Sequence, residues 1–144
     1  MPGPNDTLSA GERHKQVARD WFEAFVAQDT DRLRTLMTPD ARWMHNGSVD
    51  ISGAYEGVDA IIENFVKAAH PLFVPGTMAI EISLLLAEGN TVALEFVSTG
   101  ISAATGKNYN NPYGLFLEFR DGLIAEAREY VDTAHSADVL YLKA

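Results

Sequence analysis

The sequence contains no cysteine, so the protein has no disulfides, no thiolate metal sites and no cysteine nucleophile. A chain without cysteine suits a reducing compartment, and we expect a cytoplasmic location. No apolar run approaches the roughly 20 residues that cross a bilayer. The first residues, MPGPNDTLSAGE, show no basic segment followed by an apolar stretch. We therefore expect neither export nor a membrane partner.

Positive charge is also scarce. Eleven Lys and Arg stand against 20 Asp and Glu, the formal net charge is -9, and the basic residues form no cluster. Such a surface repels phosphate backbones, so nucleic acid is not an expected partner. The sequence has no phosphate-binding glycine loop, no G-x-S-x-G turn, no dinucleotide fingerprint and no histidine pair with metal spacing. We expect neither a cofactor nor a metal.

What is present fits one globular domain, with 144 residues of which 47% are hydrophobic. Ser9 opens a capping-box pattern in front of a helix predicted over 10–27, with its apolar residues on one stripe. Asp29 or Thr30 can cap a second, short helix that ends before Pro39.

The middle of the chain predicts a short strand over 41–46, a polar loop, and a third helix over 57–70 that the next proline stops. From Thr77 onward β-type runs are separated by the turn segments Glu88-Gly89-Asn90, Ala104-Thr105-Gly106 and Asp121-Gly122. These connections are too short for parallel crossovers. An α+β fold with an antiparallel sheet and helices on one face follows.

Domain boundaries follow from the same pattern. We expect a disordered lead over 1–9, the domain over 10–135 and a C-terminal tail over 136–144. In the run over 108–119 both strand faces carry apolar side chains. A sheet covered by helices on one face and by a second subunit on the other accounts for this, so we expect a homodimer.

Two stretches near the end of the chain resemble SnoaL-like proteins. They are Asn111-x-Tyr113 and the segment FRDGLI followed by REYVD (119–124 and 128–132). The order of elements over 12–135 resembles the nuclear-transport-factor-2-like superfamily. The resemblance implies a cone-shaped, strongly curved sheet wrapped around three N-terminal helices, with an internal apolar pocket. The superfamily includes ketosteroid isomerases, polyketide cyclases, dehydratases, epoxide hydrolases and binding modules, so the fold alone does not give the function.

The ketosteroid isomerase pattern combines a carboxylate base with an oxyanion hole made of a tyrosine and a protonated aspartic acid. Matched to that pattern, His45 takes the place of the base, Trp21 that of the tyrosine on the first helix, and Leu115 that of the acidic donor. A leucine cannot donate to an enolate. The usual steroid isomerase mechanism is therefore not expected, although the pocket can do proton chemistry with other groups.

His45 is the first candidate for a catalytic base, because the resemblance points its strand face into the cavity and its unperturbed pKa lies near neutral pH. Glu129 alternates with Ala127 and Val131, so we expect a carboxyl group among apolar neighbours that acts as an acid or orients His45. The alternative is structural: a buried histidine with satisfied hydrogen bonds, and a glutamate paired with a surface cation.

Asn111 and Tyr113 share a strand face, where an amide and a phenol could hold a substrate oxygen. The alternative is a bulge at 110–112 whose side chains satisfy backbone groups. Further candidates for substrate contact are the aromatic residues Trp21, Trp43 and Phe65, together with Leu115 and with Glu95, which we expect to be buried.

These features predict a cofactor-independent enzyme that isomerises, cyclises or dehydrates a hydrophobic carbonyl compound by general acid-base chemistry. His45 and Glu129 would be catalytic. The alternative is a non-catalytic protein that binds a hydrophobic ligand, or a dimeric module for assembly.

Overall fold

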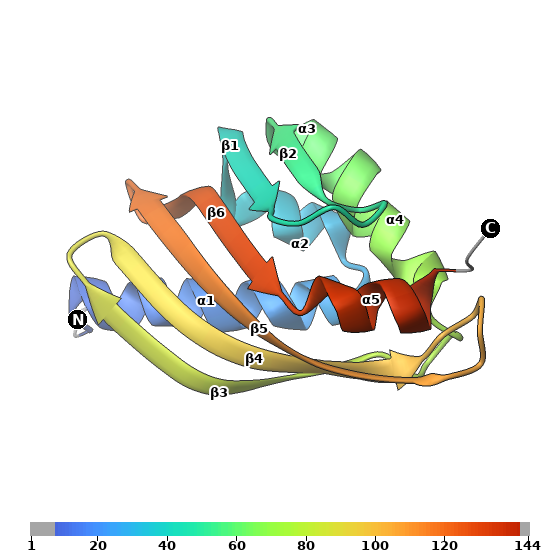
Figure 1. Cartoon of the computed structure of the whole chain (residues 1–144). Coiled ribbons are helices and arrows are strands. Elements are labelled where there is room, and N and C mark those ends of the chain that lie inside the picture. The colour runs from blue at the N-terminus through green and yellow to red at the C-terminus, as the bar shows by residue number, and fades with distance from the viewer. Residues whose placement is uncertain (1–7, 142–144) are drawn as a thin grey trace.

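A computed structural model describes residues 8–141 of the chain (Figure 1). Before the long strands it contains two separate helices and one composite helix: α1 (Ala10–Ala27), α2 (Thr30–Thr35), and the consecutive segments α3 (Val58–Ala60), η1 (Ile61–Val66), α4 (Lys67–Ala69) and η2 (His70–Leu72). The predicted caps are present, since the side chain of Ser9 accepts from Glu12 N and that of Asp29 accepts from Arg32 N. None of the described helices is both long and apolar enough to cross a bilayer.

The composite helix begins after Gly57, whose φ of 92° suits glycine, and its last 3₁₀ turn contains Pro71 and ends at Leu72. Its middle, η1, is a π-helix in which Ile61, Ile62, Phe65 and Val66 are all buried. A π-helical segment changes the angular spacing of side chains around a helix, and such segments are frequent at functional sites. Here the wider turn directs four apolar side chains of a six-residue segment inward.

Six strands form one sheet in the order β2-β1-β6-β5-β4-β3. Their bounds are β1 (Met37–His45), β2 (Gly53–Glu56), β3 (Ala79–Glu88), β4 (Thr91–Ile101), β5 (Asn108–Arg120) and β6 (Leu123–Val131). The meander from β3 to β6 is antiparallel as predicted. The sheet as a whole is mixed rather than antiparallel, because β1 pairs with β6 in parallel. The chain between them is long enough for a parallel connection, which reasoning from the short turns alone overlooked. Strand β2 was predicted as loop.

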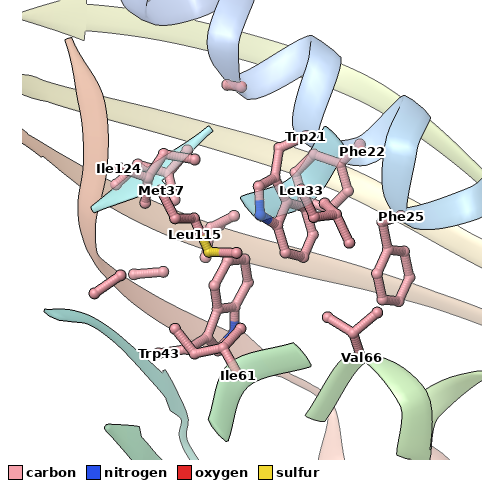
Figure 2. Packing of buried hydrophobic residues seen from close by; sticks show 14 of the residues in the cluster. Trp21, Phe22, Phe25, Leu33, Met37, Trp43, Ile61, Val66, Leu115 and Ile124 are labelled. Atoms are coloured by element: carbon pink, nitrogen blue, oxygen red, sulfur yellow. The ribbon is translucent and has the colours of Figure 1, made fainter. Parts of the chain in front are cut away.

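The core lies between α1 and the concave face of the curved sheet, with the composite helix closing one side (Figure 1). Trp21 of α1 stacks on Trp43 of β1 with ring centroids 4.5 Å apart, and on Phe25 at 5.3 Å. Figure 2 shows the α1 aromatic side chains together with Trp43 and with Ile61 and Val66 of the composite helix. Aromatic rings from α1 and β1, together with aliphatic side chains of the composite helix, therefore form the centre of the molecule.

A last helix, α5 (Thr133–Leu140), follows β6 and packs on the end of β5. Asp132 caps it by accepting from Ala134 N and His135 N. Ser136 is buried on its inner side. The segment expected as a tail over 136–144 thus lies partly in a packed helix. Residues 142–144 of that tail and residues 1–7 of the expected lead lie outside the described residues.

Candidate active site

The predicted internal apolar pocket lies between the concave face of the sheet, α1, the composite helix and α5. Its volume is about 60 Å³, and about 590 Å³ of space lies between its walls when the open mouth is counted. The aromatic walls are Trp21, Phe22, Phe25, Trp43, Phe65, Phe73 and Phe96. The polar side chains that reach it are His45, Ser98, Tyr113, Glu129, Ser136 and Tyr141. No lysine or arginine is among the described residues of the wall.

His45 and Glu129 lie side by side because β1 and β6 run in parallel and place these two residues in register. Each side chain is buried, with only 5% of each residue exposed. His45 Nε2 lies 3.9 Å from Glu129 Oε1, and Trp43 Nε1 donates to the same oxygen at 3.4 Å. An imidazole and a carboxyl group therefore face each other inside an aromatic cavity.

The neighbouring loop holds both groups in place. The main-chain N–H and the side-chain amide of Asn46 donate to the carbonyl oxygen of Glu129 at 3.0 and 3.1 Å, which fixes the end of β1 to β6. Ser52 Oγ lies 3.2 Å from His45 Nδ1 and also accepts from Val49 N at 3.2 Å. The hydrogen bond at Nδ1 leaves Nε2 to face Glu129, so the loop sets the orientation of the imidazole.

Burial shifts the acid-base properties of the site. It raises the pKa of Glu129 from 4.5 to about 7, and the Trp43 N–H partly opposes this by stabilising the carboxylate. Burial lowers the pKa of His45. The pKa of Tyr113 is raised, first by burial and then by the nearby Tyr109 and Glu129. Near neutral pH the imidazole is neutral, the phenol keeps its proton, and Glu129 can take up or release one.

Tyr113 closes the pocket on the β5 side. Its ring stacks on Phe96 with centroids 4.7 Å apart, and its hydroxyl lies 2.6 Å from that of Tyr109. Glu129 pairs with Leu115, two residues along β5 from Tyr113, so Tyr113 and Glu129 are diagonal neighbours on one face. A phenol donor and an acid-base group thus both reach the cavity.

Most of the predicted site residues meet at this cavity: Trp21, Trp43, His45, Phe65, Tyr113 and Glu129 all line it. Glu95 does not, and the expectation that it is buried is wrong. It faces the outer side of the sheet, because inward positions of β4 are taken by Leu94, Phe96 and Ser98. Leu115 is not part of the wall either, since it is buried in the main core.

Asn111 also lies off the cavity wall, although it is completely buried. Its amide nitrogen donates to the Tyr109 hydroxyl and to Asp132 O, both at 2.9 Å. The alternative bulge over 110–112 is absent, because β5 stays in register with β4 there. Asn111 therefore satisfies a backbone carbonyl, as the alternative interpretation expects, and it does not line the pocket where a ligand could contact it.

Sequence reasoning missed several polar residues of the site. Ser98 follows the inward alternation of β4, so strand parity could have indicated it. Ser136 and Tyr141 reach the cavity only because α5 folds back over the end of the sheet. Ser52 contacts His45 through a loop conformation that leaves no periodic signal in the sequence.

Gly100 of β4 makes room for one wall of the cavity. A Cβ there would lie 2.6 Å from Cδ1 of Phe73, whose ring lines the pocket. Gly100→Ala is expected to destabilise the fold by about 1–3 kcal/mol, because the ring and its neighbours must shift. Denaturant unfolding measures this. Gly114→Ala is the matched control, since its Cβ meets nothing within 4 Å, and equal losses in both variants would contradict the close contact.

Comparisons with known structures find the same fold. Similar ones are Bal32a from a soil-derived mobile gene cassette (TM-score 0.81, 21% identity, 92% of this chain and 100% of that chain), TerC co-crystallised with polyporic acid (0.78, 18%, 89% and 98%) and a protein from Jannaschia sp. CCS1 named as a SnoaL-like polyketide cyclase (0.73, 20%, 92% and 94%). A search of curated proteins finds no match.

The curved mixed sheet and the N-terminal helices match those of solved NTF2-like proteins, so the chain has the nuclear-transport-factor-2-like fold. The model of the SnoaL-like domain family matches residues 18–127. The chain belongs to the SnoaL-like domain family, and the predicted resemblance is confirmed.

Proposed function

We propose that this protein is a cofactor-independent enzyme that moves a proton next to the carbonyl group of a hydrophobic, uncharged small molecule. The observation that carries the proposal is the pair formed by His45 and Glu129, 3.9 Å apart and both buried in an aromatic cavity. Buried acid-base groups with shifted pKa values in a pocket are characteristic of catalytic sites. We propose a cytoplasmic location, because a chain without cysteine suits a reducing compartment.

In this proposal His45 Nε2 takes the proton from the carbon beside the carbonyl, while Nδ1–H donates to Ser52 Oγ. Glu129 in its ionised form stabilises the imidazolium, and in its neutral form it can supply a proton to the product. Tyr113 donates to the carbonyl oxygen, on which negative charge develops as the C–H bond breaks. Return of the proton to another atom of the substrate completes an isomerisation or leads into cyclisation or dehydration.

The charge of the wall supports an uncharged substrate. The described residues that line the cavity include a carboxyl group and an imidazole but no lysine or arginine. A carboxylate or phosphate ligand would lose its hydration without gaining a counter-charge, which is costly in an apolar site. Among the similar structures, TerC was co-crystallised with polyporic acid and the Jannaschia protein is named as a polyketide cyclase, which favours a small organic molecule as the ligand of this pocket too.

A thermal-shift screen tests the proposal. The purified protein is heated with apolar ketones, polycyclic phenols and steroids, with His45→Ala beside the wild type. A ligand at about 100 times its dissociation constant stabilises the fold by about 2.7 kcal/mol, which a domain of this size registers as a clear shift in Tm. Both proteins are expected to respond to the same ketone. Absence of any shift across the panel would contradict a small-molecule site.

A non-catalytic binding protein is the second candidate, and the continuous aromatic stack from Phe25 through Trp21 and Trp43 to Phe65 favours it. Such a wall binds apolar ligands whatever the polar groups do. The two candidates differ in one measurable respect. An enzyme loses turnover and keeps affinity when Glu129 is neutralised, whereas a carrier has no turnover to lose.

We also propose that the protein is a homodimer formed through the outer face of the sheet. Leu86, Ala93 and Phe116 lie in one row across β3, β4 and β5, and Tyr130 lies in the next row on β6. Leu86, Phe116 and Tyr130 are 55%, 41% and 47% exposed. An apolar patch on a sheet face that no helix of the described chain covers is typical of a subunit interface.

Phe116→Glu is therefore expected to convert the dimer to a monomer, because it replaces an apolar ring of the patch with a carboxylate that association would strip of water. Pairing with the neighbouring Arg128 offsets only part of that cost, since Arg128 already contacts Glu118 and Glu126. Light scattering coupled to size-exclusion chromatography measures the mass of the particle. Val26→Glu, an equivalent change at an exposed residue of α1, serves as the control and should stay dimeric. A monomeric wild type, or a Phe116→Glu variant that remains dimeric, would contradict this interface.

A further inference from the structure

A chain of polar side chains leads from the cavity into α5. The Tyr113 hydroxyl lies 2.6 Å from the Tyr109 hydroxyl, which lies 2.9 Å from Ser136 Oγ. The amide nitrogen of Asn111 donates to the Tyr109 hydroxyl at 2.9 Å and approaches Ser136 Oγ at 3.2 Å. Asp132 O accepts from the same amide at 2.9 Å. Tyr113 and Ser136, at the two ends of this series, reach the cavity wall. Tyr109 and Asn111, between them, are buried away from solvent.

The three hydroxyl groups carry three hydrogens, but only two contacts join one hydroxyl to the next, so one hydrogen must point elsewhere. Each of the three hydroxyls carries one hydrogen and can accept two bonds, whereas the Asn111 nitrogen can only donate. In one arrangement Ser136 donates to Asp132 O, Tyr109 donates to Ser136, and Tyr113 donates to Tyr109. The bond from Ser136 to Asp132 O is long, at 3.3 Å, and Asp132 O keeps its bond from Asn111 when Ser136 turns away.

In the reverse arrangement Ser136 donates to Tyr109 and Tyr109 donates to Tyr113, so the Tyr113 hydrogen is free to point into the cavity. The fixed amide of Asn111 still donates to this chain at its inner end. The change gives up the bond from Ser136 to Asp132 O, and it leaves the Tyr113 hydrogen as the one hydroxyl hydrogen of this network without an acceptor. A ligand oxygen beside Tyr113 gains a hydrogen bond, and it therefore selects the second arrangement.

We infer that Tyr109, Ser136 and Asn111 are positioning residues that turn the Tyr113 hydroxyl toward the substrate's carbonyl oxygen, so that α5 completes the oxygen-binding half of the site. This inference rests on the proposed function and adds to it the residues that act through Tyr113. Each hydroxyl that donates along the chain also becomes a better acceptor from the one behind it, and such chains polarise one another. Tyr113 is thereby a stronger donor than an isolated phenol.

The position of Tyr113 fits this role. It is a diagonal neighbour of Glu129, which lies in register with His45 on the adjacent strand. Diagonal neighbours on one sheet face lie roughly 5–8 Å apart at Cβ. A carbonyl oxygen at Tyr113 therefore leaves the carbon beside it within reach of the acid-base pair. Burial also keeps the Tyr113 phenol protonated, as its raised pKa indicates, so that it remains a donor.

The carbonyl stretch of bound acetophenone labelled with ¹³C at the carbonyl tests the inference by infrared difference spectroscopy. A hydrogen bond lowers this frequency relative to the ketone in hexane. Wild type is expected to show the shift, Tyr113→Phe to lose it, and Tyr109→Phe and Ser136→Ala to show a smaller one. The Kd for acetophenone is expected to rise about fivefold in Tyr113→Phe, the effect of one hydrogen bond.

Matched variants separate this role from a merely structural one. Tyr55→Phe removes a phenol hydroxyl that donates to Ile51 O and should leave the frequency unchanged. Ser136→Thr keeps the hydroxyl and should restore the shift that Ser136→Ala reduces, which also covers the case in which Tyr109→Phe fails to fold. Glu129→Gln should keep the full shift, since Glu129 acts on the proton and not on the oxygen.

Two results would overturn the inference. One is a carbonyl frequency in Tyr113→Phe equal to that of the wild type. The other is a full shift in both Ser136→Ala and Tyr109→Phe, which would mean that Tyr113 acts without the chain. Failure of acetophenone and the rest of the ketone panel to bind wild-type protein would contradict the proposed function itself and the inference with it, so the two failures are distinguishable.

Discussion

Glu129→Gln is expected to lower the rate of proton transfer by about 10²- to 10⁴-fold, the usual contribution of a general acid-base group. The amide has nearly the shape of the carboxyl group but can neither take up nor release a proton near neutral pH. The Kd for a ketone should change little, because the cavity walls remain. The rate is measured by proton NMR as exchange of the hydrogens beside the carbonyl in D₂O.

His45→Ala should cause a loss of similar size with Tm nearly unchanged. Glu95→Gln is the control for removal of a carboxyl group, since Glu95 is exposed on the outer face of the sheet. The Glu95→Gln variant should catalyse exchange of the ketone hydrogens at the wild-type rate. A Glu129→Gln variant with full activity would show that Glu129 is not part of the proton path. Unfolding of His45→Ala would instead make His45 structural.

The pH dependence of stability should take opposite slopes in the two variants. Glu129 has a folded-state pKa of about 7, above its ordinary 4.5, so the folded state retains a proton that the unfolded state releases. Its contribution to the free energy of unfolding is therefore full below pH 4.5 and is lost as the pH rises through about 7. The loss amounts to about 3 kcal/mol, at 1.36 kcal/mol per pKa unit.

His45 acts in the other direction. Burial lowers its folded-state pKa below 6.5, so the unfolded state binds a proton that the folded state excludes, and stability is lost as the pH falls below 6.5. In the wild type the two contributions oppose each other between about pH 4.5 and 6.5. Removal of either group exposes the contribution of the other.

Urea unfolding of both variants and the wild type at a series of pH values measures these slopes. Relative to the wild type, Glu129→Gln should gain about 3 kcal/mol between about pH 4.5 and 8. The free energy of unfolding of His45→Ala should fall relative to that of the wild type as the pH rises toward 6.5. Parallel curves for all three proteins would contradict the burial of an ionisable pair in the folded state.

The local parts of the fold could be predicted from the sequence because their causes are local. Ser9 and Asp29 cap helices, and Pro71 limits the composite helix to one last 3₁₀ turn, whatever the rest of the chain does. The meander follows from turns such as Asp121-Gly122. Strand alternation likewise puts Tyr113 on one face with Asn111 and Glu129 on one face with Ala127, and it groups Ser98 with Leu94 and Phe96.

The rest depends on contacts between segments far apart in the sequence. The resemblance points the strand face of His45 into the cavity, and alternation groups Glu129 with Ala127 and Val131. Only the parallel pairing of β1 with β6 brings His45 and Glu129 together. Helix α5 carries little hydrophobic periodicity, so the sequence predicts a tail over 136–144 and does not indicate Ser136. Alternation alone could not exclude Glu95, because both faces of β4 carry apolar residues. The register that places it outside is a tertiary property.

The most direct test of acid-base chemistry in this cavity is exchange of the hydrogens beside the carbonyl of acetophenone, or of the best ketone from the thermal screen, by the wild-type protein in D₂O. The expected result is exchange well above that in buffer alone, with a rate that changes as the pH passes through about 7, where Glu129 titrates. Tight binding of the ketone with exchange no faster than in buffer would contradict the account and leave the protein a carrier of hydrophobic ligands.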